Sequence, residues 1–142
     1  LKEAGFAFNI NALMGGQLEA DSEHKLFMIF PEGNWVEVGQ ASPYFIIGNS
    51  SHGKPLMDRA LCYESTMPFA LKVGFLAFNA TRVSANDVDY PIDVVVYRNN
   101  SFHIDSFRFE RTDLEPYALW WQEKIVQGIN EFSDDWFKDV FS

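Results

Sequence analysis

The sequence predicts an α+β fold in which a pair of helices separates two groups of antiparallel strands and a further helix follows. Short apolar runs, alternating or β-branched and bounded by turn residues, predict strands before residue 48 and after residue 91. Apolar residues recur at helical spacing between these groups and near the C-terminus. Because 47% of the 142 residues are hydrophobic and 22% are charged, we expect one core and a single domain over residues 1–142.

Three strands are predicted in the first third of the chain. Residues 6–13 alternate and then run apolar into two glycines, which predicts a strand that ends at a glycine bend. Residues 25–30 and 35–38 predict a hairpin, because the Pro-Glu-Gly-Asn segment between them is typical of turns. Residues 44–47 (YFII) predict a third short strand, which ends at a glycine.

Two helices are predicted in the middle of the chain. Pro55 suits the first turn of a helix, and three apolar residues follow it at i, i+4 and i+7: Leu56, Ala60 and Tyr63. Ser65 or Thr66 can cap a second helix. This second helix has a narrow face of mostly small side chains that allows a close neighbour: Ala70, Gly74, Ala77, Phe78 and Thr81.

The last part of the chain predicts a hairpin and a long helix. Residues 92–97 are β-branched and residues 102–109 alternate, with a polar turn between them. Asp113 is placed to cap a final helix that carries Pro116 in its first turn. One side of that helix is apolar, with Tyr117, Trp121, Ile125, Gly128 and Phe132.

Charge and composition limit the classes of partner that this chain can bind. The formal net charge of −9 argues against nucleic acid, and the chain has no apolar run near the roughly 18 residues that a membrane span needs. A lone cysteine, Cys62, and no evident leader predict a reducing cytoplasm. The 14 Phe, 5 Tyr and 4 Trp are hard to bury in a small domain, so we expect a partner surface.

Motifs for metal and cofactor chemistry are weak. His24, His52 and His103 stand near three different predicted elements without metal-ligand spacing. The acids of residues 87–89, with Asp93, invite a metal-dependent phosphatase hypothesis, but they precede a strand instead of following one. Nucleotide-binding glycine loops and the usual serine-nucleophile motif are absent from the sequence. We therefore expect no metal and no cofactor.

Four strings resemble the Anbu (ancestral beta subunit) family of bacterial proteasome-like proteins. They are LMGGQL at residues 13–18, LFMIFPEGNWVEV at 26–38, YFIIGNSSHGKPLMDRAL at 44–61 and ATRVSANDVDYPIDVVVY at 80–97. The resemblance runs from about Phe6 through the final helix. It implies the C-terminal part of an N-terminal-nucleophile (Ntn) hydrolase, a four-layer αββα sandwich. The chain would be a partial domain, without the family's first strands and its nucleophilic Thr, Ser or Cys, which lie upstream of Leu1.

The resemblance also assigns supporting residues to the site. Gly48, Asn49 and Ser50 occupy the place where proteasome beta subunits carry a Gly-Ser-Gly turn beside the nucleophile, and Asn86 and Asp87 lie in the place of an Asp-x-x-Ser-Gly loop. Neither match is faithful, because Asn49 replaces a serine and no Ser-Gly follows Asp87. The alternative is that these residues only cap the adjoining helices.

The resemblance implies two alternative functions. The first is a threonine-type peptidase subunit that holds a peptide substrate by strand pairing, binds the missing N-terminal segment and self-associates into a ring-like or helical homo-oligomer. The alternative is a non-catalytic subunit that keeps the fold for assembly. This chain alone is expected to be inactive, because Leu1 supplies only an amine.

Overall fold

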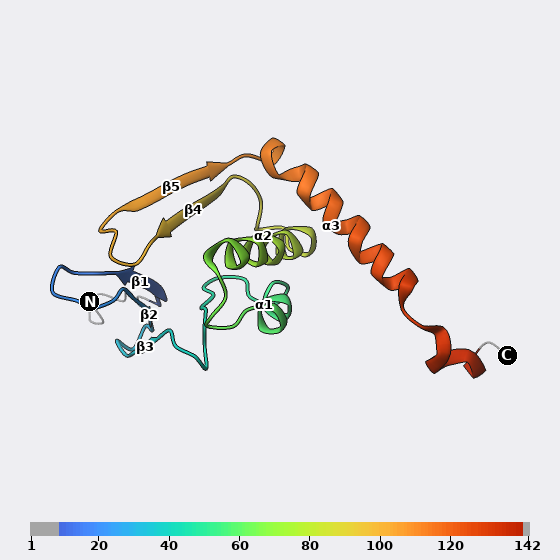
Figure 1. The fold of residues 1–142 in the computed structure, drawn as a ribbon, viewed down its shortest axis with the longest axis horizontal. Helices are drawn as coiled ribbons and strands as arrows, with labels where there is room; N and C mark the ends of the chain where they lie inside the picture. The colour runs from blue at the N-terminus through green and yellow to red at the C-terminus, as the bar shows by residue number, and fades with distance from the viewer. Residues whose placement is uncertain (1–8, 141–142) are drawn as a thin grey trace.

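The computed structural model describes residues 9–140, which form two small antiparallel sheets and three α-helices (Figure 1). The first sheet has the strand order β1-β2-β3, and β4 and β5 form the second. The helices α1 and α2 lie beside each other near the β4–β5 hairpin, and α3 runs outward from that hairpin to the C-terminal end (Figure 1). The predicted mixture of helices and antiparallel strands is confirmed.

The first sheet is formed by β1 (Ala12–Gly16), β2 (Lys25–Ile29) and β3 (Trp35–Glu37). The predicted hairpin over β2 and β3 is confirmed, and its turn includes Gly33 at a φ of 86°. The predicted strand over residues 6–13 is misplaced in its described part, and residues 6–8 lie outside the described range. The two glycines are not a bend, because they pair with β2, and a Cβ on Gly15 would lie 3.0 Å from Leu26 Cδ1.

The predicted strand over residues 44–47 is wrong. These residues belong to no sheet in the described part of the chain. A strand needs a neighbouring backbone to accept and donate its hydrogen bonds, and apolar β-formers alone do not supply one. The segment instead passes from the first sheet to α1 as irregular backbone.

The central pair of helices is α1 (Lys54–Ala60) and α2 (Met67–Ser84). Thr66 caps α2, as predicted, because its Oγ1 accepts a hydrogen bond from the Phe69 N–H at 3.4 Å. Tyr63 lies beyond the end of α1, so that helix is shorter than predicted. The predicted close approach to α2 is confirmed at Gly53, where an added Cβ would lie 2.8 Å from the Ala77 carbonyl oxygen.

The second sheet and the last helix follow. β4 (Ile92–Tyr97) has the predicted bounds, whereas β5 (Ile104–Phe109) begins two residues later than predicted, because Phe102 still has a turn conformation with a φ of 48°. The cap of α3 (Arg111–Glu131) is Glu110, not Asp113. The Asp113 carboxylate accepts a hydrogen bond from the Glu110 N–H at 2.8 Å, so it closes the first turn from inside the helix.

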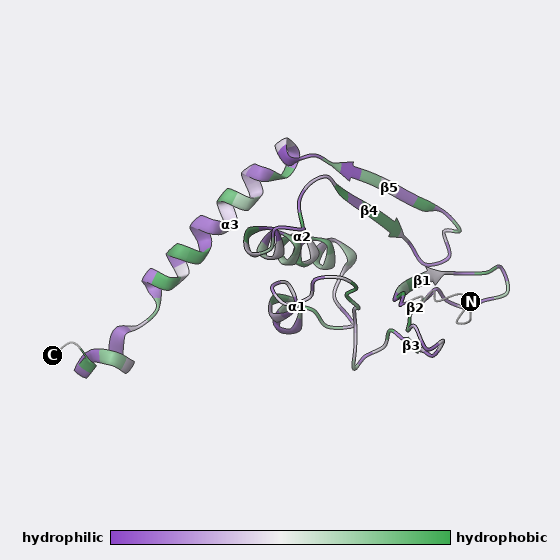
Figure 2. Ribbon diagram, turned by 180° about the vertical axis from the view of Figure 1, so that it is seen from behind, coloured by the Kyte–Doolittle hydropathy of each residue, from purple (hydrophilic) through white to green (hydrophobic). Residues whose placement is uncertain are grey.

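Few apolar side chains are buried. The buried hydrophobic residues of the described part are Val73, Ala77 and Ala118. The first half of α3 faces α2 across a groove that Leu114 and Trp121 help to line, while Ile125 and Phe132 are 46% and 65% exposed. Figure 2 shows hydrophobic segments along this outward-running helix and along β4 and β5. Within the described residues, no helix combines the length and apolarity that a membrane crossing requires.

A short 3₁₀ helix, η2 (Asp134–Val140), ends the described chain. Within it, the rings of Trp136 and Phe137 meet edge to face with their centroids 4.8 Å apart. The ring of Trp136 also meets that of Phe132, at the end of α3, with the centroids 6.5 Å apart.

Gln17 joins the two sheets. Its amide nitrogen donates to Asn100 Oδ1 at 2.7 Å, and its amide oxygen accepts from the Tyr97 hydroxyl at 2.9 Å and from the Asn100 N–H at 3.0 Å. His24 Nδ1 and Asn99 Oδ1 lie 3.1 Å apart beside it. A polar cluster between the end of β1 and the β4–β5 turn therefore sets the relative position of the sheets.

Candidate functional site

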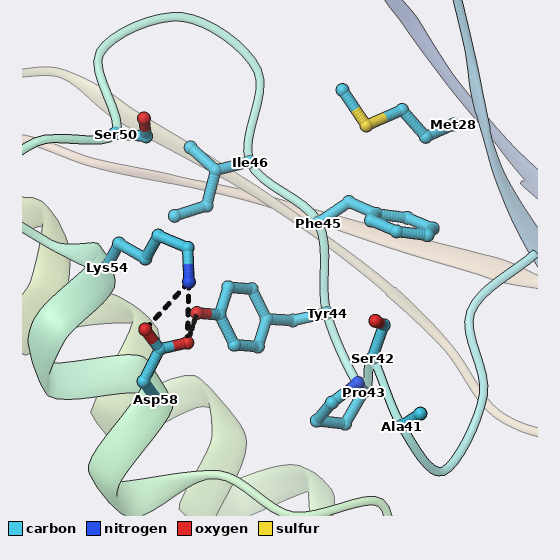
Figure 3. A pocket seen from close by; sticks show the side chains of 10 residues that line it. All are labelled: Met28, Ala41, Ser42, Pro43, Tyr44, Phe45, Ile46, Ser50, Lys54 and Asp58. Atoms are coloured by element: carbon cyan, nitrogen blue, oxygen red, sulfur yellow. Dashed lines mark hydrogen bonds and ion pairs between the residues drawn. The ribbon is translucent and has the colours of Figure 1, made fainter. Parts of the chain in front are cut away.

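The candidate site lies where irregular backbone meets the start of α1. Residues 44–47 lead into Gly48, whose φ of 84° favours glycine and turns the chain toward the helix. A hollow of about 340 Å³ opens beside this segment (Figure 3). Its lining includes Met28 from β2, Tyr44, Ser50, and two charged residues of α1, Lys54 and Asp58.

Tyr44, Lys54 and Asp58 form a hydrogen-bonded cluster at one side of the hollow (Figure 3). The Tyr44 hydroxyl donates to Asp58 Oδ1, and Lys54 Nζ donates to both Asp58 oxygens at 2.8 and 2.7 Å. Lys54 Nζ also lies 6.0 Å from the centre of the Tyr44 ring. The cluster thereby ties the backbone before Gly48 to the helix that follows it, and it holds the turn from both ends.

The ionisation of the cluster follows from these contacts. Hydrogen bonds from Lys54 and then from Tyr44 lower the pKa of Asp58, and the bond to Asp58 raises the pKa of Lys54. Burial, with the bond to Asp58 as a second cause, raises the pKa of Tyr44. The cluster is thus a carboxylate, an ammonium and a neutral phenol at neutral pH, which makes it suited to positioning and poorly suited to accepting a proton.

The turn itself is stabilised locally. Asn49 Oδ1 accepts a hydrogen bond from the Ser51 N–H at 3.3 Å, and the Ser50 carbonyl accepts one from the Lys54 N–H at 3.3 Å. Gly48, Asn49 and Ser50 are all exposed, and the Ser50 side chain borders the hollow. Neither side chain caps α1, whose N-cap is Gly53, and the exposed side of the turn stays accessible.

The second predicted segment lies elsewhere. Asn86 and Asp87 form an exposed turn beyond the end of α2. Among the described residues, no hydrogen bond joins this turn to Gly48, Asn49 or Ser50. The structure thus displays both segments at the surface without bringing them into direct contact.

The other acids of the sequence analysis are paired with arginines. Arg111 donates to both oxygens of Asp89 at 2.8 and 2.7 Å, and Arg108 donates to both oxygens of Asp93 at 2.7 Å. No group of three or more His, Cys, Asp or Glu side chains in residues 9–140 could hold a metal ion. Of the carboxylates that prompted the phosphatase hypothesis, Asp89 and Asp93 are thus engaged in ion pairs.

Sequence reasoning missed the cluster around Asp58. The i,i+4 spacing of Lys54 and Asp58 is a signal for an ion pair on a helix, and it could have been used. Tyr44 carried no such signal, because 14 residues of turn and helix separate it from Asp58. It also missed Tyr90, whose ring lies between the guanidinium groups of Arg82 and Arg111 at 5.2 and 5.3 Å.

Solved structures of Anbu proteins are similar to this chain. Anbu from Hyphomicrobium sp. strain MC1 is 29% identical, with a TM-score of 0.86 over 94% of this chain and 58% of that chain. Anbu from Yersinia bercovieri is 33% identical, with a TM-score of 0.83 over 93% of this chain and 57% of that chain. The chain thus spans less than three fifths of the length of these relatives.

A third structure shows the same fold at lower identity. It is the helical assembly of the Anbu complex from Pseudomonas aeruginosa, 24% identical, with a TM-score of 0.86 over 94% of this chain and 56% of that chain. No protein-family model matches the sequence. No curated protein sequence matches it either.

Proposed function

Because this chain belongs to the proteasome-like Anbu family, as the C-terminal portion of its subunit, we propose that it is the supporting part of a threonine-type Ntn peptidase. Upstream sequence would supply the N-terminal nucleophile and the remaining strands of an αββα sandwich, of which this chain is a partial domain. The observation that carries the proposal is the glycine turn at Gly48, held at the surface by the Tyr44, Lys54 and Asp58 cluster.

Each predicted residue has a supporting role in this proposal. Gly48 gives the left-handed backbone that turns the chain, and Asn49 fixes the turn by accepting from the Ser51 N–H. Ser50 offers an exposed hydroxyl for the α-amine and side chain of an N-terminal nucleophile, while Asn86 and Asp87 offer an amide and a carboxylate from the end of α2. Peptide substrate would be held by strand pairing.

Self-association is part of the proposed function. The related Anbu from Pseudomonas aeruginosa forms a helical assembly, and this chain exposes large apolar side chains over both sheets and α3. We propose that its subunits likewise assemble into a homo-oligomer.

Two measurements test the peptidase proposal. The coding sequence upstream of Leu1 is expected to begin with Thr, Ser or Cys directly after the initiating Met, and any other residue there would contradict catalysis. In the full subunit, Ser50→Ala and Asp87→Ala are expected to lower kcat for peptide hydrolysis at least about tenfold. The neighbouring Ser51→Ala is the matched control and should leave kcat unchanged.

A non-catalytic assembly subunit is the second candidate. It is favoured by one observation, that the Asn49 side chain is used to stabilise its own turn, where proteasome-type sites would present a serine. An upstream sequence without a nucleophile, together with an intact oligomer, would favour this candidate over the peptidase.

A further inference from the structure

An apolar groove separates the paired helices from α3. It has a volume of about 570 Å³ and is lined by residues of α1, α2 and α3. Leu56, Leu71, Phe75, Tyr117 and Trp121 supply much of its wall, and Lys72 is the charged residue among those that line it. Leu71 is 46% exposed and Tyr117 is 61% exposed, so the groove is open to a partner. We call it the helical groove.

The far end of α3, with its cap residue and the start of η2, presents the matching apolar surface. Ile129, Phe132 and Trp136 are 67%, 65% and 73% exposed, and the rings of Phe132 and Trp136 contact each other. We call these three residues the α3 tip. Ile129 and Phe132 continue the side of α3 on which Ala118 and Trp121 contact the body of the chain, so the apolar stripe extends beyond its last support.

The tip and the groove cannot meet within one chain. In Figures 1 and 2, α3 carries its C-terminal end away from α1 and α2, and the helix is continuous from Arg111 to Glu131. The Anbu structures with TM-scores of 0.83 to 0.86 match 93–94% of this chain and 56–58% of their own chains, so the same arrangement of helices recurs in longer chains. The α3 tip of a second copy can therefore enter the helical groove that the first copy's own tip cannot reach.

Size and charge favour this occupant. A cavity of about 570 Å³ lies within the range of roughly 300–1,000 Å³ of pockets that bury drug-sized ligands, so it has room for bulky side chains such as Phe132 and Trp136. The tip is flanked by the exposed acids Glu131 and Asp134, and the groove offers Lys72. Opposite charges at the rim would align the two surfaces as they meet.

We propose that the α3 tip of one copy docks into the helical groove of the next, so that copies join head to tail. The inference rests on the proposed self-association and assigns its surface. A heterologous contact of this kind generates either a closed ring or an open helical filament, depending on the rotation between copies. Each copy in the middle of such an assembly uses one tip and one groove.

Paired variants test this arrangement. The tip variant combines Phe132→Ser with Trp136→Ser, and the groove variant combines Leu71→Glu with Tyr117→Glu. Made in the full subunit, each is expected to sediment as a monomer at concentrations where the unmodified subunit forms larger species. Mixed in equal amounts, the two variants are expected to form a species of twice the monomer mass and no larger one, because one intact tip and one intact groove remain. Trp35→Ser, on another exposed tryptophan, is the matched control and should leave the assembly unchanged.

The possible outcomes distinguish a wrong contact surface from a failure of self-association itself. If the tip variant or the groove variant keeps the assembly, another surface or another segment joins the copies and the inference is wrong. If both variants are monomeric but fail to pair when mixed, the contact is not head to tail and the inference is also wrong. If the unmodified full subunit is a monomer at all concentrations, the proposed self-association fails together with its surface.

Discussion

Asp58 accepts hydrogen bonds from both Tyr44 and Lys54, so it controls the backbone on each side of Gly48. Asp58→Ala is expected to free residues 44–50 and to increase amide hydrogen exchange at Ser51 and Lys54 several-fold, with little effect on the exchange of α2. The matched control is Asp93→Ala, which breaks an equally exposed pair with Arg108 on β4 and β5. Equal exchange at Ser51 in the two variants would contradict the positioning role.

The same cluster predicts that the stability of the folded chain falls at both acidic and alkaline pH. The lowered pKa of Asp58 stabilises the folded chain above the ordinary aspartate pKa of about 3.9, and this contribution is lost as the pH falls through the lowered value. The raised pKa of Tyr44 stabilises the folded chain below the ordinary value of about 10, and this contribution is lost as the pH rises through the raised value.

Melting temperatures measured against pH check both ends. Asp58→Asn should differ from the unmodified chain by less at strongly acidic pH than at neutral pH. Tyr44→Phe should differ by less at strongly alkaline pH than at neutral pH. A difference that is constant across the range would show that ionisation of the cluster does not contribute to stability.

Single residues were predicted well where the signal was local. Thr66 as a cap and the turn at Gly33 follow from the preferences of individual residues, and the structure contains both. Asp113 was assigned as a cap because it is a strong capping type, but Glu110 stands three residues earlier and Asp113 instead closes the turn. The bond between Tyr44 and Asp58 depends on how irregular backbone returns to a helix, which residue preference does not specify.

At the scale of elements, the contact between α1 and α2 depends on Gly53. A Cβ there would lie 2.8 Å from the Ala77 carbonyl oxygen and 3.1 Å from the Ala77 Cβ, so Gly53→Ala forces the helices apart. We expect a loss of about 1–3 kcal/mol in the free energy of unfolding, measured by denaturant titration.

Gly74→Ala is the contrasting change in the same helix pair. Gly74 lies inside α2, and an added Cβ meets nothing within 4 Å. We expect this substitution to stabilise the chain by about 0.5–1 kcal/mol, because glycine is a poor helix former. If Gly53→Ala leaves the stability unchanged or raises it as Gly74→Ala does, the close contact at Gly53 does not limit the packing of the helices.

The elements show what local pattern can and cannot predict. β4 has its predicted bounds, because a β-branched run stands beside a turn and an alternating partner only a few residues later. Residues 44–47 have equally strong strand propensity and form no strand, because no partner pairs with them in the described chain. Strand propensity favours an extended backbone, whereas a β-sheet also needs a second strand close enough to form backbone hydrogen bonds.

At the scale of the whole molecule, the described residues expose far more apolar surface than they bury. No side chain among them is completely buried, and the exposed hydrophobic residues include Val95 and Phe107 in β4 and β5. We expect the purified chain to bind the dye ANS strongly and to melt with low cooperativity. Weak ANS binding with a sharp melt would mean that the chain covers these faces by itself.

Catalysis is also a prediction about the whole molecule. Purified alone, residues 1–142 are expected to hydrolyse no fluorogenic peptide, since the described site offers positioning groups and no activated nucleophile. Turnover that an inhibitor of N-terminal nucleophiles blocks would contradict this expectation. The sequence indicated the family through four strings, but it did not indicate that α3 would extend away from the body.

The hydrogen bonds of Gln17 have a mechanical consequence. They connect the end of β1 to the β4–β5 turn at one corner of each sheet. Contacts at a single corner fix the separation of the two sheets there, and they do not by themselves fix the angle between the sheets. A strand or helix that packs between the two sheets would therefore set the angle between them.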